Sequence, residues 1–303
     1  MSTDDLTVFG DWGTTRLRLT LFDGEHQLAQ ADGPGIGALT ASAADTLLAA
    51  LAPWRGRYRL ERVVLCGMAG SRSGVIEAPY LDCPAGASDW AGQAASLALD
   101  GLSIRIAPGF AASLANGAPD VMRGEETQVF GALALRPELS QGDHWLVLPG
   151  THSKWCHISD GRILSFQTFL TGELFALLST RSSLLLGADR SVDRDAGERG
   201  FSEGLARAQE GRALSALFET RAAQLRARRS GAWAEGFLSG LMIGAEVAEA
   251  VEMFDVQAAT LVGASSLIQR YRPALQGHGL SVETLSGEDC VLAGLRLLAG
   301  KRS

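Results

Sequence analysis

The residues best suited to chemistry follow the first apolar segment of the chain, where Asp11 precedes Trp12-Gly13-Thr14-Thr15. Alternating apolar positions after this turn predict a strand, a tight turn and a second strand. Glycine lets the backbone approach a ligand closely, and the N–H and hydroxyl groups of Gly13, Thr14 and Thr15 can donate to phosphate oxygens. The Asp11 carboxylate can take Mg²⁺ through a water molecule. Taken alone, the pattern is equally typical of a plain hairpin loop.

The same pattern returns at Gly150-Thr151-His152-Ser153, again after an apolar run. In the first copy Gly13-Thr14 precedes Asp23-Gly24 by ten residues, and in the second Gly150-Thr151 precedes Asp160-Gly161 by the same ten. Each copy therefore predicts an antiparallel meander, because an Asp-Gly pair between apolar segments is a strong hairpin signal. Two such meanders facing each other could hold one nucleotide from both sides.

Length and composition restrict the class of protein. A chain of 303 residues with 46% apolar residues favours two domains with real cores. The net charge of −7 argues against nucleic acid or an anionic membrane as the partner, and no apolar run has the length of a membrane helix. Asp4 and Asp5 stand where a secretory signal would be basic. The widely spaced cysteines predict free thiols in a cytoplasmic protein, namely Cys66, Cys83, Cys156 and Cys290.

Two glycine-rich segments of the first half need an interpretation. Gly33-Pro34-Gly35-Ile36-Gly37-Ala38 matches the dinucleotide fingerprint formally, but antiparallel strands precede it and no acidic residue follows at the required distance. We therefore do not expect a dinucleotide there. Val63 to Cys66 predicts a buried strand that runs into a loop with Gly70, Ser71 and Arg72. Such a loop can present a ligand site, although a flexible connection with a solvated arginine is the plain alternative.

Arg123-Gly124-Glu125-Glu126 is predicted to open a helix that continues to Leu135. Adjacent carboxylates at a helix start can simply favour the macrodipole, or they can face a cleft. Pro137 to Asp143 combines proline, glycine and charge, so we place the domain boundary near residue 140, with domains at 1–140 and 141–303. The last helix, Glu288 to Leu298, is expected to be able to pack back on the first domain.

The second half carries three further signals. A helix is predicted to begin near Thr171-Gly172-Glu173, and Gly236, Gly240 and Gly244 form a narrow stripe where another helix can pack closely. The strand before Gly263-Ala264-Ser265-Ser266 ends in a loop without bulky side chains, suited to a flat base or a ribose. Arginines between 221 and 229 are interpreted as a solvated helix face because acidic residues accompany them.

In their order along the chain, these motifs resemble the actin, sugar-kinase and heat-shock chaperone superfamily. More narrowly, they are similar to the 2-dehydro-3-deoxygalactonokinase family over essentially the whole chain. The motifs that carry this resemblance are Gly67-Met68-Ala69-Gly70-Ser71-Arg72, Arg123-Gly124-Glu125-Glu126-Thr127, Pro149-Gly150-Thr151-His152-Ser153-Lys154-Trp155 and Thr171-Gly172-Glu173-Leu174-Phe175.

The resemblance implies an α/β fold of two ribonuclease-H-like domains that close on ATP and Mg²⁺. The implied reaction is phosphorylation of 2-dehydro-3-deoxy-D-galactonate at its terminal hydroxyl, in galactonate breakdown. The alternatives are a kinase of the same fold for another sugar or sugar acid and, more distantly, a chaperone-like nucleotide-binding protein. A small-molecule partner is expected, and homo-oligomerisation is left open.

The implied site has a nucleotide side and a substrate side. Asp11 would hold the metal by a water bridge, and Gly13, Thr14, Thr15, Gly150, Thr151, His152, Ser153, Gly263, Ala264 and Ser265 would bind the nucleotide. Gly70, Ser71, Arg72, Thr171, Glu173 and Lys154 would bind the sugar acid, with Arg72 on its carboxylate and Lys154 as the alternative anchor.

The catalytic base is expected at the start of the helix that connects the two domains. Many sugar kinases of the superfamily use an aspartate there, whereas this chain offers Glu125 and Glu126. We choose Glu125, because it follows Gly124 directly and Glu126 is then free to cap or pair locally. The alternative is that both carboxylates only stabilise the helix end.

Overall fold

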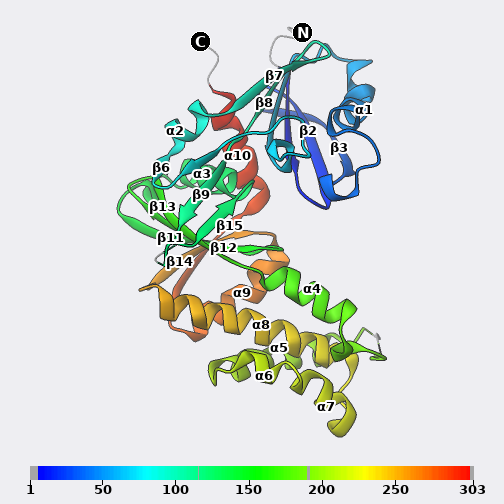
Figure 1. Ribbon diagram of the computed structural model, residues 1–303, viewed down its shortest axis with the longest axis vertical. Helices are drawn as coiled ribbons and strands as arrows, with labels where there is room; N and C mark the ends of the chain where they lie inside the picture. Colours follow the sequence, from blue (N-terminus) through cyan, green and yellow to red (C-terminus); the bar gives the residue numbers. More distant parts are fainter. Residues whose placement is uncertain (1–5, 115, 190–191, 301–303) are drawn as a thin grey trace. The chain divides into compact units, whose positions relative to one another are not determined.

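The computed structural model describes residues 6–114, 116–189 and 192–300 (Figure 1). Asp4 and Asp5 lie outside the described residues. Contacts within the chain define two compact units, which are described separately. Unit 1 comprises Met1–Asp143, Cys156–Phe166 and Leu285–Ser303, and unit 2 comprises His144–Trp155 and Gln167–Thr284. The domain limits expected from the sequence, 1–140 and 141–303, stay a prediction.

The main sheet of unit 1 has the strand order β3-β2-β1-β4-β8-β7. Its strands are β1 (Leu6–Trp12), β2 (Arg16–Asp23), β3 (His26–Pro34), β4 (Arg62–Gly67), β7 (Ala95–Leu99) and β8 (Leu102–Ile106). The first three strands pair antiparallel, so the first predicted meander is confirmed. β4 pairs in parallel with both β1 and β8. The ends of β1 and β4 therefore lie at the same edge of the sheet.

Alternating apolar residues of β1 and β2 form the core of unit 1 together with α1 (Ala43–Arg55). Leu17, Leu19 and Leu21 of β2 are buried against Leu47 and Leu51 of this helix. Ser42 caps the helix, as its Oγ accepts the N–H of Asp45. The helix ends at Arg55, and Gly56 follows it.

The rest of unit 1 contains short strands, one short helix and two longer helices. The strands are β5 (Tyr80–Asp82), β6 (Ala85–Gly86), β9 (Gly109–Ser113) and β10 (Pro119–Met122), and the helices are α2 (Ala87–Gly92), α3 (Glu125–Leu135) and α10 (Gly287–Ala299), with single turns η1 (Ile36–Ala38), η2 (Met68–Gly70) and η3 (Pro137–Ser140). β10, β9 and β5 form a small sheet in that order.

Glycines let α3 and α10 touch at the backbone. A Cβ at Gly131 of α3 would lie 1.7 Å from the carbonyl oxygen of Cys290, and one at Gly294 of α10 would lie 2.0 Å from that of Thr127. Both distances are far below a van der Waals contact, so neither position accepts a side chain. The first turn of α3, which carries Glu125 and Glu126, is therefore fixed against α10.

Unit 2 holds all or part of the remaining strands, in the order β15-β14-β11-β12-β13. These are β11 (Asp143–Leu148), β12 (Ser153–Ser159), β13 (Arg162–Phe169), β14 (Ala258–Gly263) and β15 (Ser281–Ser286). β11, β12 and β13 are successive neighbours, which confirms the second predicted meander. Asp160 and Gly161, between the last two, have φ of 45° and 74°, as a two-residue hairpin turn requires.

The helices of unit 2 are α4 (Thr171–Arg181), α5 (Arg194–Gln209), α6 (Ala213–Ala216), α7 (Glu219–Ala227), α8 (Gly231–Met253) and α9 (Ser265–Gly277), with the turn η4 (Ser183–Leu185). The loop expected at Gly263 to Ser266 is shorter than predicted, because Ser265 already belongs to α9. No helix among the described residues is long and apolar enough to cross a membrane.

The glycine stripe of α8 packs against α5, which runs alongside it (Figure 1). A Cβ at Gly236 would lie 2.1 Å from the carbonyl oxygen of Gly197, and one at Gly240 would lie 2.1 Å from that of Phe201. Gly200 of α5 meets the Trp233 carbonyl oxygen in the same way, at 2.1 Å. The predicted close packing along this stripe is confirmed, and glycines on the partner helix complete it.

Candidate active site

Asp11 lies near the end of β1, where the sheet register places it between a residue of each neighbouring strand. Arg18 on β2 and Cys66 on β4 are its neighbours across the two ladders. An Arg18 Nη2–H donates to Asp11 Oδ2 at 2.6 Å, and the Cys66 thiol faces Asp11 Oδ1 at 3.8 Å. The Asp11 side chain remains 21% exposed. This carboxylate is thus partly accessible, and the half-exposed Arg18 guanidinium pairs with it.

The turn at Gly13, Thr14 and Thr15 leaves both threonine side chains exposed. The segment that matches the dinucleotide fingerprint packs behind it. The N–H of Gly37 donates to the Thr14 carbonyl oxygen at 2.9 Å, and a Cβ at Gly35 would lie 2.3 Å from the same oxygen. These glycines therefore support the turn from behind, which gives their spacing a structural reason that needs no dinucleotide.

The first turn of α3 lies against the end of β4. A Cβ at Gly124, the residue before the helix, would lie 3.2 Å from the Cα of Gly67. Gly67 has φ of 74°, and a Cβ there would lie 3.5 Å from Asp11 Oδ1. Both glycines are needed because the two backbones meet at this point. The structure thus brings Asp11 and the carboxylates of α3 into one neighbourhood of unit 1.

The two adjacent glutamates of α3 differ sharply in exposure. Glu126 is fully buried, and its carboxylate accepts the N–H of Gly124 at 2.6 Å and the hydroxyl of Thr127 at 3.0 Å. Burial, with the charge of Glu125 as the second cause, raises the pKa of Glu126 to about 8. Glu125 is half-buried, and its Oε2 accepts the N–H of Arg123 at 3.2 Å. Glu125 is therefore the more accessible of the two carboxylates.

Cys66 lies within the field of these acids. Burial raises the pKa of the Cys66 thiol well above its usual range, and the nearby charges of Asp11 and Glu126 raise it further. A buried thiol that resists deprotonation is a poor nucleophile. None of Cys66, Cys83, Cys156 and Cys290 forms a disulfide, as expected. Three of them are buried, whereas Cys83 is only half-buried.

The raised pKa of Glu126 makes the stability of the protein depend on pH. The unfolded chain releases this proton near pH 4.5 and the folded chain near pH 8, so the folded state holds more protons between these values. Stability contributed at this site is then lost as the pH rises through that window, by at most about 1.4 kcal/mol per pH unit. Glu126→Gln, which resembles the protonated form, should escape that loss. Urea unfolding from pH 5 to pH 9 measures it.

The difference in stability between Glu126→Gln and the wild type should shift in favour of the variant from pH 5 to pH 8 and then level off. Glu77→Gln, at a carboxylate that is 62% exposed, is the matched control and should follow the wild type. Parallel curves for Glu126→Gln and the wild type across the whole range would contradict a buried proton at Glu126.

Arg72, in the loop after β4, and Arg123, just before α3, have different surroundings. Arg72 is 89% exposed and its Nε–H donates to Glu77 at 3.2 Å. Arg123 instead lies over the Tyr80 ring at 4.1 Å and donates to the Ala78 carbonyl oxygen at 2.9 Å. Among the described residues, buried Ser71 Oγ and Arg123 Nη1 have no hydrogen-bond partner. Gly70 is buried against Arg123, since a Cβ there would lie 2.8 Å from Nη1.

In unit 2, the Gly150–Ser153 turn lies directly on the first turn of α4. A Cβ at Gly172 would lie 2.2 Å from the Gly150 carbonyl oxygen, and the N–H of Glu173 donates to the Thr151 carbonyl oxygen at 2.8 Å. The exposed His152 ring forms a hydrogen bond with the Glu173 carboxylate. The sequence-predicted residues at 150–153 and 171–173 are therefore one structural group.

Two further predicted residues border this turn. Gly263, at the end of β14, adjoins it, because a Cβ there would lie 3.7 Å from Pro149. Ala264 and Ser265, which follow Gly263, are exposed. Lys154 is only 3% exposed, although its position next to the turn predicted an accessible anchor. A role of Lys154 in contacting substrate is still a prediction.

A buried glutamate beneath this turn is a feature that the sequence reasoning missed. Glu246 of α8 is 3% exposed. Its carboxylate accepts hydrogen bonds from Ser153 Oγ at 2.7 Å, Trp155 Nε1 at 2.9 Å and the Tyr271 hydroxyl at 2.6 Å. The only sequence signal is an acidic residue on a helix face that is otherwise apolar, next to the glycine stripe.

The residues around Asp11 fit a magnesium ion held chiefly by water and phosphate. Mg²⁺ commonly takes one or two protein carboxylates and keeps several waters. Asp11 offers one partly exposed carboxylate at a strand end; Arg18 donates to Oδ2, and within the described part of the chain Oδ1 has only the long contact with the Cys66 thiol. Among residues 6–114, 116–189 and 192–300, no group of three or more His, Cys, Asp or Glu side chains could hold a metal alone.

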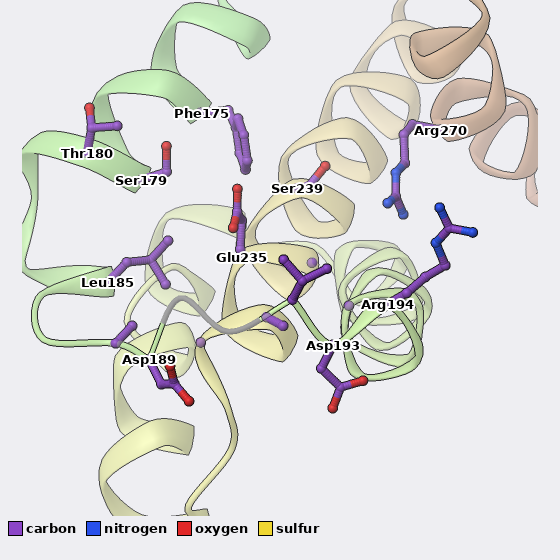
Figure 2. A pocket seen from close by; sticks show the side chains of 16 residues that line it. Phe175, Ser179, Thr180, Leu185, Asp189, Asp193, Arg194, Glu235, Ser239 and Arg270 are labelled. Atoms are coloured by element: carbon purple, nitrogen blue, oxygen red, sulfur yellow. The ribbon is translucent and has the colours of Figure 1, made fainter.

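A separate pocket of about 490 Å³ lies among the helices of unit 2 (Figure 2). Its charged lining includes Asp193, Glu235 and Arg270. Asp193 caps α5, and Arg270 pairs with Glu198 at 2.8 Å. None of the residues predicted from the sequence to bind nucleotide or substrate lines it. We assign this pocket no part in the proposed reaction.

A comparison with protein-family models shows which family the chain belongs to. The family described as 2-keto-3-deoxy-galactonokinase matches residues 11–298. The chain belongs to this family. Its match begins at Asp11 and ends within α10, so it includes every candidate site residue. The family resemblance inferred from the motifs is confirmed.

Two curated relatives of this 2-keto-3-deoxy-galactonokinase family member are similar over nearly their whole length. The 2-dehydro-3-deoxygalactonokinase of Escherichia coli (strain K12) is 38% identical over 293 residues, which cover 95% of this chain and 96% of the relative. A Rhizobium meliloti (strain 1021) protein, named as a candidate 2-dehydro-3-deoxygalactonokinase, is 37% identical over 295 residues, 95% of each chain.

Superposition on solved structures supports the same fold for this family member. A candidate 2-dehydro-3-deoxygalactonokinase from Sinorhizobium meliloti, solved by crystallography, superposes with a TM-score of 0.88 at 36% identity, covering 97% of this chain and 95% of that chain. Acetate kinase from Entamoeba histolytica reaches 0.50 at 9% identity, over 95% of this chain and 97% of that chain. The predicted α/β fold is confirmed, and this acetate kinase shares it.

Proposed function

We propose that this protein phosphorylates the terminal hydroxyl of 2-dehydro-3-deoxy-D-galactonate with ATP, as a step of galactonate breakdown in the cytoplasm. The observation that carries the proposal is the family match over residues 11–298, together with relatives at 37% and 38% identity that bear this activity in their names. The phosphate-binding motifs and the carboxylates of α3 fall within the matched region.

Phosphoryl transfer needs charge neutralisation, alignment and a proton acceptor more than covalent chemistry from the protein. In the proposal, Asp11 holds Mg²⁺ through water, and the ion neutralises charge on the phosphates when bound. The exposed threonines of the Gly13–Thr15 turn and the N–H groups of the Gly150–Ser153 turn bind phosphate oxygens. Gly263, Ala264 and Ser265 accommodate the nucleoside.

The acceptor hydroxyl is a weak nucleophile near neutral pH, so a carboxylate must orient it and take its proton. Glu125 is our candidate, since it is half-buried and accessible while Glu126 is fully buried. With a pKa of about 8, Glu126 keeps its proton at neutral pH. Because Glu126 is protonated, it does not repel the Glu125 carboxylate, and both side chains can lie in the first turn of α3.

A substrate screen tests the proposed activity directly. ADP release is measured in a coupled assay with 2-dehydro-3-deoxy-D-galactonate, its C4 epimer and neutral sugars such as glucose. We expect kcat/KM for the galactonate derivative to exceed that for neutral sugars by at least about a thousandfold, because a lost charged contact and a misplaced hydroxyl both cost transition-state binding. A preference for the C4 epimer would support a kinase for another sugar acid, and turnover of neutral sugars alone would reject the proposal.

Arg72 is the proposed anchor for the substrate carboxylate, because a guanidinium can bind both carboxylate oxygens at once. Arg72→Lys keeps the charge but loses the fork. KM for the sugar acid should then rise by about 5- to 50-fold, the size of one charge-assisted hydrogen bond, while KM for ATP changes little. Initial rates at varied acid and fixed saturating ATP, then the reverse, measure both constants.

Glu77→Gln is the control for Arg72→Lys, since it removes the present partner of Arg72 without changing the guanidinium. It should leave KM for the acid equal to that of the wild type or lower it. A rise in KM for ATP in Arg72→Lys, with KM for the acid unchanged, would assign the loop to the nucleotide.

A further inference from the structure

Glu246 gathers hydrogen-bond donors from separate elements of unit 2. Ser153 and Trp155 at the start of β12 donate to Oε1, and Tyr271 of α9 donates to Oε2. Thr171, the first residue of α4, has its hydroxyl near this carboxylate and lowers the pKa of Glu246. One side chain of α8 thus joins β12, α4 and α9.

The chemistry of these neighbours matches a carboxylate. An indole N–H can only donate, and the three hydroxyls are placed to donate as well, so an acceptor with two oxygens suits them all. Burial raises the pKa of Glu246, and the hydrogen bonds from Thr171, Tyr271, Ser153 and Trp155 oppose that rise. Burial of a carboxylate without such donors would cost free energy, so these donors are what allows a glutamate at position 246.

Two of these donors border the turn that the proposed function assigns to phosphate. Ser153 ends the Gly150–Ser153 turn, and Thr171 begins the helix whose Gly172 touches the Gly150 carbonyl oxygen. Glu246 therefore holds both the turn and the helix start on which the turn lies. Its carboxylate is covered by the protein and is not itself available to a ligand.

We propose that Glu246 is a positioning residue, which holds the Gly150–Ser153 turn and the first turn of α4 in the conformation that binds nucleotide phosphate. This inference rests on the proposed function only in its assignment of phosphate to that turn. It predicts that loss of the Glu246 carboxylate weakens nucleotide binding more than another substitution that lowers the stability of the protein by the same amount. Displacement of a positioning group by about 1 Å can cost roughly a hundredfold in activity.

The test compares Glu246→Gln with Tyr271→Phe in the full chain. Glu246→Gln keeps the shape of the side chain. It leaves a single acceptor oxygen, whereas the donors in the wild type are shared between two. Tyr271→Phe removes one donor to the same carboxylate from the α9 side and leaves the bonds of Ser153 and Trp155 in place. Isothermal titration with MgADP gives Kd, urea unfolding gives stability, and kcat and both KM values are measured for each variant.

We expect Glu246→Gln to raise Kd for MgADP at least about tenfold, as lost hydrogen bonds to a charged group do. Tyr271→Phe should lose similar stability but keep Kd within about threefold. The Trp155 indole N–H resonance, assigned with Trp155→Phe, should move in Glu246→Gln. Glu249→Gln, at an exposed position on the same helix, should match the wild type throughout.

Equal effects of Glu246→Gln and Tyr271→Phe on Kd, or no effect of either, would overturn the inference and leave Glu246 a purely structural residue. If Glu246→Gln does not fold, Trp155→Phe removes a donor from β12 and carries the same expected rise in Kd; an unchanged Kd in that variant would overturn the inference. The wild-type titration and the substrate screen judge the proposed function separately, because they involve no variant.

Discussion

Asp11→Asn should lower kcat by on the order of 10²-fold or more at saturating magnesium, because charge neutralisation and alignment carry most of phosphoryl transfer. Asparagine has the shape of aspartate but no charge for the metal or for Arg18. The fold should survive, since the side chain lies at a strand end and is 21% exposed. Steady-state rates over a magnesium titration, with circular dichroism on the same samples, measure both effects.

Asp32→Asn is the matched control for Asp11→Asn. Asp32 lies on β3 of the same sheet, is 59% exposed and pairs with Arg16 at 2.8 Å, so the chemical change is the same at a neighbouring ion pair. It should change kcat by less than about twofold, as an exposed salt bridge contributes little. A folded Asp11→Asn enzyme with near-normal kcat would remove Asp11 from the site.

Glu125→Gln should lower kcat by roughly 10²- to 10⁴-fold, the contribution typical of a general base. Glutamine keeps the size of the side chain and can still accept the Arg123 N–H, so the helix start and substrate binding should persist. KM for both substrates should stay within a few-fold. Single-turnover measurements would separate the chemical step from product release.

Glu126→Gln is the control for Glu125→Gln on the same helix turn. Its carboxyl is buried and already protonated at neutral pH, so the amide changes little for the reaction and kcat should fall by less than about tenfold. The reverse order of effects would move the base to Glu126. Normal turnover in both variants would show that the base lies elsewhere and that both carboxylates only stabilise α3.

Much of the fold could be predicted from short-range patterns in the sequence. The ten-residue spacing between Gly-Thr and Asp-Gly turns identified both meanders, because turn residues and alternating apolar positions act over a few residues. The stripe at Gly236 and Gly240 predicted a close helix contact, because two helix backbones can touch only where neither has a side chain between them. Family motifs added the reaction class.

The sequence could not assign the surroundings of each site residue, because these depend on pairings between distant elements. Arg18 faces Asp11 through the hairpin register, a relation that counting outward from the turn could have predicted. Cys66 faces Asp11 through a parallel pairing, which no local pattern encodes. The choice between Glu125 and Glu126 likewise depends on burial, since Glu126 is fully buried and Glu125 only half-buried.

Glu246 shows the limit most clearly. Ser153 and Trp155 lie 93 and 91 positions away from it in the chain, and Tyr271 lies 25 positions away. From the sequence, Glu246 is one acidic residue on an apolar helix. Only the tertiary structure, which brings β12, α4 and α9 around that position, provides the donors that make a buried carboxylate stable, because hydrogen bonding depends on distance in space.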